Sequence, residues 1–340
     1  MKSQKTLQQH AALASLKHKM KAIALTEIGS PDVLRISEVE RPTPNSDQGL
    51  IDITIAGVNF IDIYHRSGKY PISLPYIPGV EGIGTIAELG SNSPTDLKVG
   101  MRVGWVMASG GYAESAVIPA KTLIPIPEDL KDEDAVALLL QGMTAHYLTR
   151  NTYEVKPGDT AVVHSAAGGV GLLLTRYIKS LGGHVIATAS TDEKRAIAKS
   201  AGADLAIGYE EFPKVVKEFT KGLGANVIYD GVGKDTFDQD LLALRRRGTL
   251  AVFGAASGQV APIEIMKISA GSIFLTRPTL ADYVVERSEL LWRANEVFEA
   301  FRRGDMQVAI GGRYPLADAA SAHRNLEARQ TTGKLFLQVR

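Results

Sequence analysis

Cysteine is absent from the 340-residue chain. Its absence excludes disulfide bonds, thiolate metal ligands and cysteine nucleophiles, and it is consistent with a reducing compartment such as the cytoplasm. Long apolar runs are missing too, because no stretch approaches the roughly 18 residues that a membrane-spanning helix needs. Excess charge is also missing, since 38 Lys and Arg stand against 37 Asp and Glu, and a nucleic-acid partner is therefore not expected.

The first 20 residues lack acidic side chains and carry four lysines. They contain no arginine, and they have neither the apolar centre nor the small-residue cleavage site of a secretory signal. We interpret residues 1–20 as an N-terminal extension, with Met20 as an alternative start.

The chain after this extension shows two successive patterns. From Lys21 to about Ala120 the sequence is rich in turn-forming residues. Short β-branched runs such as Leu50–Ile55 alternate apolar and polar residues at period two. Several short strands at such spacing predict a β-barrel or sandwich. From Asp132 a helical stretch reaches Thr149, and an alternation of strands and helices follows.

Six nearly continuous apolar strands are predicted in this second part, and helices separate most of them. Parallel strands covered on both faces have this composition, so the fold class is α/β with a doubly wound parallel sheet. We expect the closing strand, Lys334–Val339, to rejoin the N-terminal β domain. The expected strands of the parallel sheet are Thr160–His164, His184–Thr188, Leu205–Ile207, Asn226–Tyr229, Thr249–Phe253 and Ser272–Thr276.

A glycine turn follows the first of these strands and leads into a helix. This is the context that a dinucleotide-binding turn requires, because the free N–H groups and the helix dipole favour a pyrophosphate. The first glycine of the usual pattern is replaced by Ala166. The residues expected to contact the cofactor here are Ala167, Gly168, Gly169, Val170 and Gly171.

The end of the second strand indicates which nicotinamide cofactor is used. An NAD site places Asp or Glu there to bind the ribose 2′-hydroxyl, whereas this strand ends in small and hydroxylated residues. The first acid, Asp192, is better explained as part of the next helix. We therefore predict NADPH, with Ser190, Lys194 and Tyr209 as candidate partners of its 2′-phosphate.

Further motifs give the chain a resemblance to a known family. It resembles the zinc-free quinone oxidoreductases of the medium-chain dehydrogenase/reductase superfamily over residues 21–340. Departures include Ser165, where the family often has Ala, and His184, where it often has Lys. The motifs are Gly57-Val-Asn-Phe-Ile-Asp-Ile-Tyr64, Arg66-Ser-Gly-Lys-Tyr-Pro71, Pro78-Gly-Val-Glu-Gly82, His164-Ser-Ala-Ala-Gly-Gly-Val-Gly171, Asp230-Gly-Val-Gly233 and Thr276-Arg-Pro278.

The resemblance implies a GroES-like β-barrel domain formed by residues 21–141 and 279–340. It implies a Rossmann domain inserted at residues 142–278, NADPH as the cofactor, and a homodimer. Tyr209 and Arg329 would flank the 2′-phosphate. The residues implied near the nicotinamide are Asn59, Thr144, Phe253 and Thr276. Val232, from the Asp230 motif, is a further implied cofactor contact.

Both zinc sites of the alcohol dehydrogenases in this superfamily are missing from the sequence. Their Gly-His-Glu signature reads Gly79-Val80-Glu81 here, and no cysteine is available as a ligand. A quinone or an enone delocalises incoming hydride charge without a Lewis acid, so it needs only positioning and a few donors. Asn59, Tyr64 and Tyr70 are the candidates for binding and orienting such a substrate.

The sequence therefore predicts a zinc-independent NADPH:quinone oxidoreductase. The nearest alternative is an NADPH-dependent reductase of 2-alkenals or enones, which only a substrate panel separates from it. A crystallin-like or RNA-binding protein is a third interpretation. RNA binding would need a basic surface, and the only compact basic run in the sequence is Arg245–Arg247. We interpret this run as the end of a helix over Thr236–Arg245.

Overall fold

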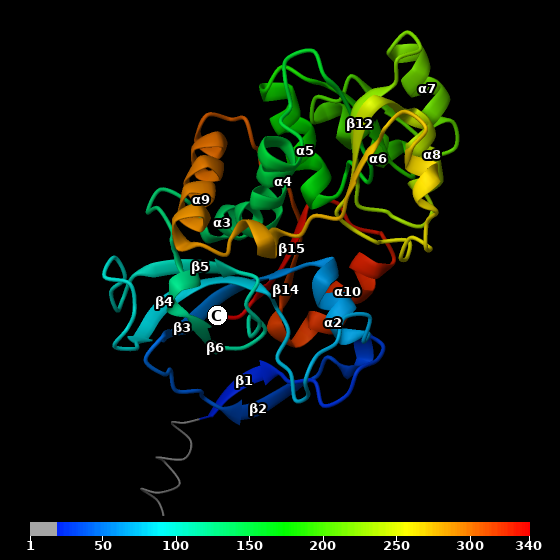
Figure 1. Cartoon of the computed structure of the whole chain (residues 1–340). Coiled ribbons are helices and arrows are strands. Elements are labelled where there is room, and N and C mark those ends of the chain that lie inside the picture. The colour runs from blue at the N-terminus through cyan, green and yellow to red at the C-terminus, as the bar shows by residue number, and fades with distance from the viewer. Residues whose placement is uncertain (1–18) are drawn as a thin grey trace, which may run out of the picture. The chain divides into compact units, whose positions relative to one another are not determined.

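The structure is a computed structural model, and it describes residues 19–340 (Figure 1). The extension predicted for residues 1–20 lies largely outside the described residues. Lys19 and Met20 were assigned to that extension wrongly, because they begin strand β1 (Lys19–Ile23) and pair with Glu40 and Val39 of β2 (Ile36–Glu40).

The chain forms two compact units, which we describe separately. Unit 1 comprises residues up to 136 together with 312–330 and 335–340. Unit 2 comprises residues 137–311 and 331–334. Within residues 19–340, no helix has the length and apolarity that crossing a bilayer requires.

Unit 1 is built on an antiparallel sheet. Its strands follow the order β14-β15-β3-β4-β5-β7, and β6 pairs with β3 beside that path. The closing strand β15 pairs with β3, so the predicted return of the last strand to the N-terminal sheet is confirmed. The bounds are β3 Gln48–Val58, β4 Glu81–Leu89, β5 Arg102–Val106, β6 Ser115–Pro119, β7 Ile124–Pro125, β14 Ile310–Pro315 and β15 Lys334–Gln338.

Alternation along β3 explains the core of this sheet. Ile51 and Ile53 are fully buried, whereas Asp52 and Thr54, which alternate with them, are half-buried. The isoleucines pack in one cluster with Trp105, whose side chain is also fully buried. Two helices, α2 (Phe60–Arg66) and α10 (Ala319–Glu327), pack against each other in the same unit.

Unit 2 is a doubly wound α/β domain. Its six-stranded sheet has the order β10-β9-β8-β11-β12-β13, and every neighbouring pair is parallel. The predicted fold class, a GroES-like β domain plus a six-stranded Rossmann sheet, is confirmed. The bounds are β8 Thr160–Val163, β9 His184–Thr188, β10 Leu205–Ile207, β11 Ala225–Asp230, β12 Leu244–Val252 and β13 Phe274–Thr276.

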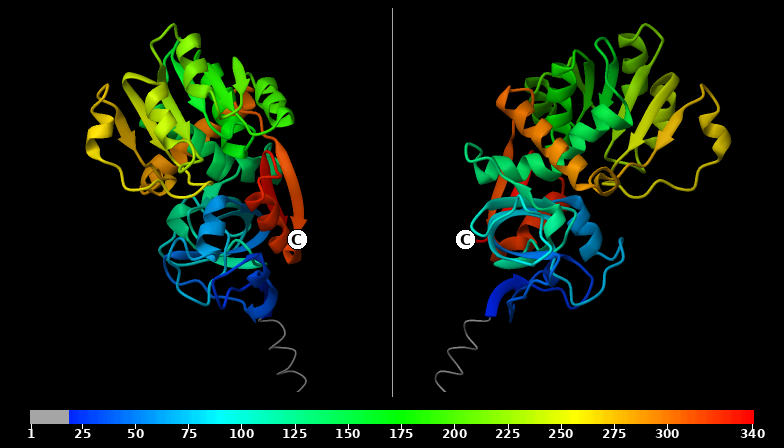
Figure 2. Two further views of the ribbon diagram at one scale, coloured as in Figure 1. Left: turned by 90° about the vertical axis from the view of Figure 1, so that its right-hand side faces the viewer. Right: turned by 60° about the vertical axis from the view of Figure 1, so that its left-hand side comes forward.

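Helices cover both faces of this sheet (Figure 2). Since the chain steps from β8 to β9 to β10 in one direction and then reverses, right-handed crossovers place α5 and α6 on one face and α7 and α8 on the other. The bounds are α5 Gly169–Ser180, α6 Asp192–Ser200, α7 Phe212–Phe219, α8 Phe237–Ala243 and α9 Arg287–Arg302, with α3 Asp132–Ala137 and α4 Met143–Tyr147 separated by a π-helical turn at Leu138–Gly142.

Two predicted elements differ from the structure. The helix expected over Thr236–Arg245 ends at Ala243, and Arg245–Arg247 lie in β12, with Arg247 at φ 56°. These arginines lie in an irregular part of the ladder, between Leu244 and Thr249, which pair with Ala225 and Val227 of β11. The second difference is α9, which was expected in the β domain but groups with unit 2 because it packs against α4.

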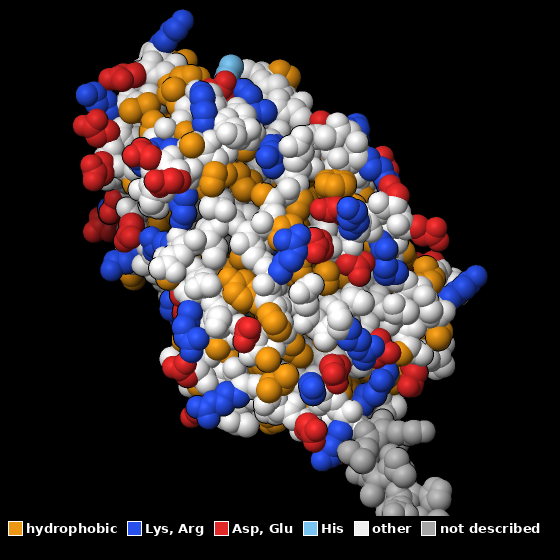
Figure 3. Space-filling view, turned by 180° about the vertical axis from the view of Figure 1, so that it is seen from behind, with side chains coloured by type: hydrophobic (Ala, Val, Ile, Leu, Met, Phe, Trp, Pro, Cys, Tyr) orange, Lys and Arg blue, Asp and Glu red, His pale blue; other side chains and the backbone are white. Residues whose placement is uncertain are grey.

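Basic and acidic side chains are interspersed over the face of the molecule shown in Figure 3.

Candidate active site

The carboxyl ends of the strands of unit 2 lie along one edge of its sheet, which we call the carboxyl edge. Because all six strands are parallel, residues that follow each strand meet at this edge. In open α/β sheets, ligands bind outside the carboxyl ends at the point where the strand order reverses, and here that point lies between β8 and β11. The predicted cofactor residues at the edge are Ala167–Gly171 after β8, Ser190 after β9, Tyr209 after β10, Val232 after β11, Phe253 after β12 and Thr276 at the end of β13.

The turn after β8 is tight enough to require glycine at one position. A Cβ on Gly171 would lie 2.5 Å from the Ser165 carbonyl oxygen and 2.7 Å from the Ala166 Cα. The left-handed residue of the turn is Ser165, at φ 50°. Ala166 does not have a positive φ, and this explains why alanine replaces the first glycine of the usual pattern.

The N-terminus of α5 suits a pyrophosphate. Its N-cap is Gly168, which has no side chain to cap the helix, and the first N–H groups of a helix have no intrahelical partner. An anion that accepts these N–H bonds also meets the positive end of the helix dipole. The residues present therefore fit a dinucleotide, because a side chain at Gly168 or Gly171 would crowd the backbone of the turn.

Tyr209, which follows β10, is hydrogen-bonded to Ser165 of this turn. Its hydroxyl accepts a hydrogen bond from the Ser165 N–H at 3.1 Å and lies 3.3 Å from the Ser165 hydroxyl. Ser190 is exposed, and Lys194 is half-buried on α6. Arg195 is occupied elsewhere, since its guanidinium donates to the Ala189 carbonyl and pairs with Asp192.

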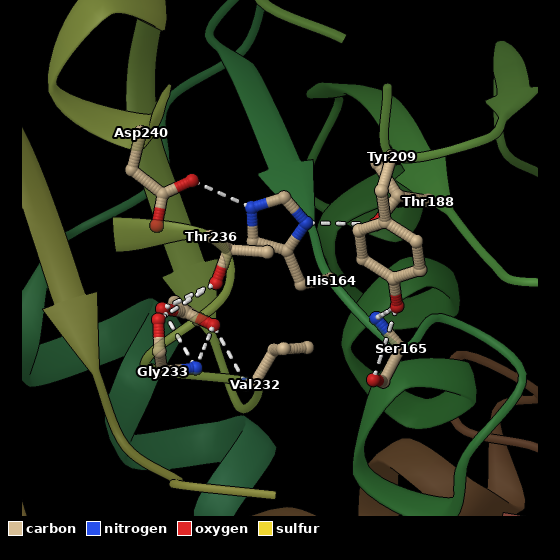
Figure 4. A network of polar contacts seen from close by, with 9 residues as sticks. His164, Ser165, Thr188, Tyr209, Val232, Gly233, Thr236 and Asp240 are labelled. Atoms are coloured by element: carbon tan, nitrogen blue, oxygen red, sulfur yellow. Dashed lines mark hydrogen bonds and ion pairs between the residues drawn. The ribbon is translucent and has the colours of Figure 1, made fainter. Parts of the chain in front are cut away.

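The loop after β11 is held by a buried carboxyl group. Asp230 accepts the N–H bonds of Val232 at 2.6 Å and Gly233 at 3.0 Å, and the Thr236 hydroxyl donates to it at 3.0 Å (Figure 4). Burial raises the pKa of Asp230 to about 6. Val232 therefore stands at the carboxyl edge in a fixed backbone conformation.

A histidine and an aspartate lie below the turn. His164 Nε2 is 2.7 Å from Asp240 Oδ1, and His164 Nδ1 is 2.7 Å from the Thr188 hydroxyl (Figure 4). Burial lowers the pKa of His164 to about 4 and raises the pKa of Asp240 well above its ordinary range. Burial thus disfavours the charged form of both groups, and their contact is a buried hydrogen bond.

Two predicted residues lie away from the strand ends. Thr144 is buried in α4 within unit 2. Arg329 belongs to unit 1, where it follows α10 at φ 54°. Their contribution to a cofactor site is a proposal that rests on the family resemblance.

In unit 1, the candidate substrate residues lie in α2 or next to its ends. Asn59 is the buried N-cap of α2, and its side-chain Nδ2 donates to Glu81 Oε1 at 2.7 Å. The rings of Tyr64 and Tyr70 meet edge to face with centroids 5.2 Å apart. Asp62 caps the helix by accepting the Asn59 N–H at 2.9 Å. The structure thus brings all three predicted substrate residues onto one segment.

Known proteins match the chain over nearly its whole length. A family model described as alcohol dehydrogenase GroES-like domain matches residues 45–128, and one described as zinc-binding dehydrogenase matches residues 169–299. A probable quinone oxidoreductase of Schizosaccharomyces pombe is 40% identical, over 93% of this chain and 96% of its own. The chain belongs to the quinone oxidoreductase family of the medium-chain dehydrogenase/reductase superfamily.

Two further family members matter for function. A 2-haloacrylate reductase of a Burkholderia species is 38% identical, over 93% of this chain and 98% of its own. The Escherichia coli quinone oxidoreductase, solved in complex with NADPH, is 37% identical and superposes with a TM-score of 0.91, over 94% of this chain and 100% of its own. Among residues 19–340, no group of three or more His, Asp or Glu is arranged to hold a metal ion.

Sequence reasoning missed the polar side chains beneath these sites. His164 and Asp230 appeared only as letters of motifs, and Asp240 did not appear. Glu81 was noted only for the missing zinc signature, although it is fully buried and contacts Asn59. The one available signal was an acid inside an apolar or glycine-rich run, because such an acid is rarely buried without a partner.

Proposed function

We propose that the chain is a zinc-independent NADPH:quinone oxidoreductase that transfers a hydride from NADPH to a quinone. The observation that carries the proposal is its 40% identity to a probable quinone oxidoreductase over 93% of the chain. The complex of the Escherichia coli relative with NADPH supports the cofactor. The test is NADPH consumption with benzoquinones and naphthoquinones, and inactivity toward all of them would reject the proposal.

We propose that the carboxyl edge of unit 2 binds NADPH. The tight turn and the N-terminus of α5 support a pyrophosphate site, and the absence of an acid at the end of β9 supports a 2′-phosphate. A higher kcat/KM with NADPH than with NADH is expected, and an NADH preference would contradict it. The proposed cofactor residues are Asn59, Thr144, Ala167, Gly168, Gly169, Val170, Gly171, Ser190, Lys194, Tyr209, Val232, Phe253, Thr276 and Arg329.

NADPH supplies the hydride when it is bound, and the side chains of α2 are proposed to bind and orient the acceptor. Tyr64 and Tyr70, whose rings meet edge to face, contribute aromatic rings and hydroxyl groups, which suit a quinone. Asn59 is the proposed donor toward the oxygen that gains charge. We expect activity to persist after treatment with a chelator, whereas loss that zinc restores would reject the metal-free reaction.

Reduction of an activated double bond is a second candidate. The observation that favours it is the 38% identity to a 2-haloacrylate reductase over 93% of the chain. Both reactions deliver a hydride to a conjugated acceptor, so the fold does not separate them. A panel of quinones, 2-alkenals and haloacrylate under one NADPH assay ranks them by kcat/KM.

We also propose a homodimer and a cytoplasmic location. β13 is the edge strand of the sheet of unit 2, and its Phe274 is 61% exposed. The preceding segment exposes Ile265 and Met266 by 72% and 69%. An unpaired strand edge beside apolar side chains fits a second copy of this chain. Sedimentation should give a dimer that Phe274→Lys dissociates, and a monomeric wild type would reject the proposal.

A further inference from the structure

A buried carboxylate faces the N-cap of α2. Glu81 is the first residue of β4 and is fully buried, and its Oε1 atom accepts the hydrogen bond of Asn59 Nδ2 at 2.7 Å. An asparagine side chain presents NH2 at one end and a carbonyl oxygen at the other, whereas a carboxylate only accepts. Glu81 therefore selects which end of the Asn59 amide points toward it.

The strand beside β4 leaves room for this carboxylate. A Cβ on Gly57 of β3 would lie 2.0 Å from Glu81 Oε1 and 2.5 Å from Glu81 Cδ. Gly57 does not have a positive φ, so its backbone conformation does not call for glycine. The missing side chain at this position is explained by the space that Glu81 occupies.

The backbone of Asn59 is held by a different acid. Asp62 accepts the N–H groups of Asn59 at 2.9 Å and Val80 at 3.2 Å, and the Tyr112 hydroxyl donates to it at 3.4 Å. The backbone at the start of α2 is thus fixed without Glu81. In the capping box the oxygen end of the Asn59 side chain accepts the Asp62 N–H, and Glu81 holds the Nδ2 end.

The direction of the bonds behind Asp62 follows from an arginine. Arg66 Nη1 can only donate, so His323 Nδ1 accepts from it at 3.4 Å. His323 then carries its proton on Nε2 and donates to the Tyr112 oxygen at 3.0 Å, which leaves the Tyr112 proton for Asp62. All these groups lie within unit 1, and they hold Asp62 as an acceptor.

We propose that Glu81 is a positioning residue, which orients the Asn59 amide for the reaction. The inference rests on the proposed function, because it assigns Asn59 to the substrate site. Glu81→Gln would keep the shape but replace the carboxylate by a neutral amide, a weaker acceptor that also carries an NH2 group, so the Nδ2 end of Asn59 would be held less firmly. Since Asn59 is proposed to act on developing charge, the loss falls on kcat more than on KM.

A double-mutant cycle tests whether Glu81 acts through Asn59. The wild type, Glu81→Gln, Asn59→Ala and the double variant are compared by kcat with NADPH and a naphthoquinone. Glu81→Gln should lower kcat about tenfold alone and less than twofold in the Asn59→Ala background. An equal loss in both backgrounds, or no loss in either, would overturn the inference.

A second readout does not depend on activity. The Asn59 side-chain amide protons, assigned by their disappearance in Asn59→Ala, should move in the nitrogen–proton correlation spectrum of Glu81→Gln. Unmoved resonances would overturn the inference even in an enzyme that reduces another substrate. A wild type inactive with quinones but with moving resonances would reject only the proposed function.

Two variants complete the design. Gly57→Ala should displace the Glu81 carboxylate and reproduce the loss in kcat, without adding to Glu81→Gln. Glu133→Gln is the matched control, because Glu133 is an ion-paired glutamate of unit 1, bonded to Arg313 on its surface. The control should leave kcat unchanged, and additive losses from Gly57→Ala and Glu81→Gln would contradict the shared cause.

Discussion

The two units build their candidate sites from different parts of the chain. In unit 2 the proposed cofactor contacts come from backbone, at a turn where Gly171 permits close approach and Gly168 leaves the helix uncapped. In unit 1 the proposed substrate contacts come from side chains on one short segment, with Asn59, Tyr64 and Tyr70. A backbone site is sensitive to added volume, whereas a side-chain site is sensitive to lost functional groups.

Their buried acids differ in the same way. Asp62 in unit 1 accepts two N–H groups and a hydroxyl, so donors stabilise a carboxylate there. Asp240 in unit 2 faces the His164 imidazole, and its Oδ2 atom has no partner among residues 19–340. Burial raises the pKa of Asp240 well above its usual range, which favours the protonated acid. The donors of unit 1 therefore favour the carboxylate form of Asp62, whereas burial in unit 2 favours the protonated form of Asp240.

The largest effect is expected at the turn of unit 2. In Gly171→Ala the new Cβ meets backbone at 2.5 Å, so the turn must shift and the NADPH-binding amides move with it. We expect the Kd for NADPH, measured by fluorescence titration, to rise about 100-fold. The control is Gly208→Ala, whose Cβ has its nearest neighbour at 3.9 Å, and it should change the Kd less than threefold. Equal effects of both variants would show that the turn does not set affinity.

A matched pair of variants tests the contrast between the acids. Asp62→Asn places an NH2 group against donors and should cost about 2–3 kcal/mol of unfolding free energy. Asp240→Asn replaces a neutral acid by a neutral amide that can still bond to His164, and it should cost less than about 1 kcal/mol. Urea unfolding at pH 7.5 measures both. A larger loss for Asp240→Asn would mean that this acid is charged in the folded protein.

Much of the fold could be predicted because its signals are local. Apolar runs interrupted by helical stretches gave the six parallel strands, and the glycines after β8 marked the turn. The end of α8 could not be predicted in this way. The arginines after Ala243 suit a helix end, whereas in the structure they follow Leu244, which already pairs with β11, and Arg247 bonds to the distant Gly271 carbonyl.

The site was less accessible from the sequence because its contacts are distant along the chain. Glu81 lies 22 residues from Asn59, and Asp240 lies 76 residues from His164. A single sequence does not show which buried acid meets which donor. The role of Ser165 was equally hidden, since its left-handed conformation and its bond to Tyr209 arise from the folded turn.

As the pH falls, unit 1 should lose stability before unit 2 does. Burial lowers the pKa of His323 in unit 1 to about 3, and those of His146 and His164 in unit 2 to about 3 and 4. The unfolded chain protonates these histidines near pH 6.5, so each one costs stability as the pH falls below that value. Asp230 opposes this loss, because its raised pKa lets the folded state take up the proton first, between pH 6 and 4. Asp240 acts in the same direction, so the opposing terms lie in unit 2.

The variant His323→Gln isolates the contribution of unit 1. Its amide can accept from Arg66 and donate to Tyr112, as the neutral imidazole does, but it does not titrate. Between pH 6.5 and 5 the wild type should lose about 2 kcal/mol more than the variant. Hydrogen exchange at the two pH values locates the loss. Equal pH dependence in both proteins would mean that His323 is protonated in the folded state.

The smallest effect is expected from the tyrosines of unit 1. Tyr64→Phe and Tyr70→Phe keep the ring pair and remove one hydroxyl each, so they should lower kcat/KM for a quinone about three- to tenfold. The Kd for NADPH should stay within twofold of the wild type, because neither tyrosine is among the proposed cofactor residues. This outcome is the reverse of that expected for Gly171→Ala, which weakens the cofactor first. Unchanged quinone kinetics would remove both tyrosines from the substrate site, whereas a large rise in the NADPH Kd would show that the two units do not divide the two ligands.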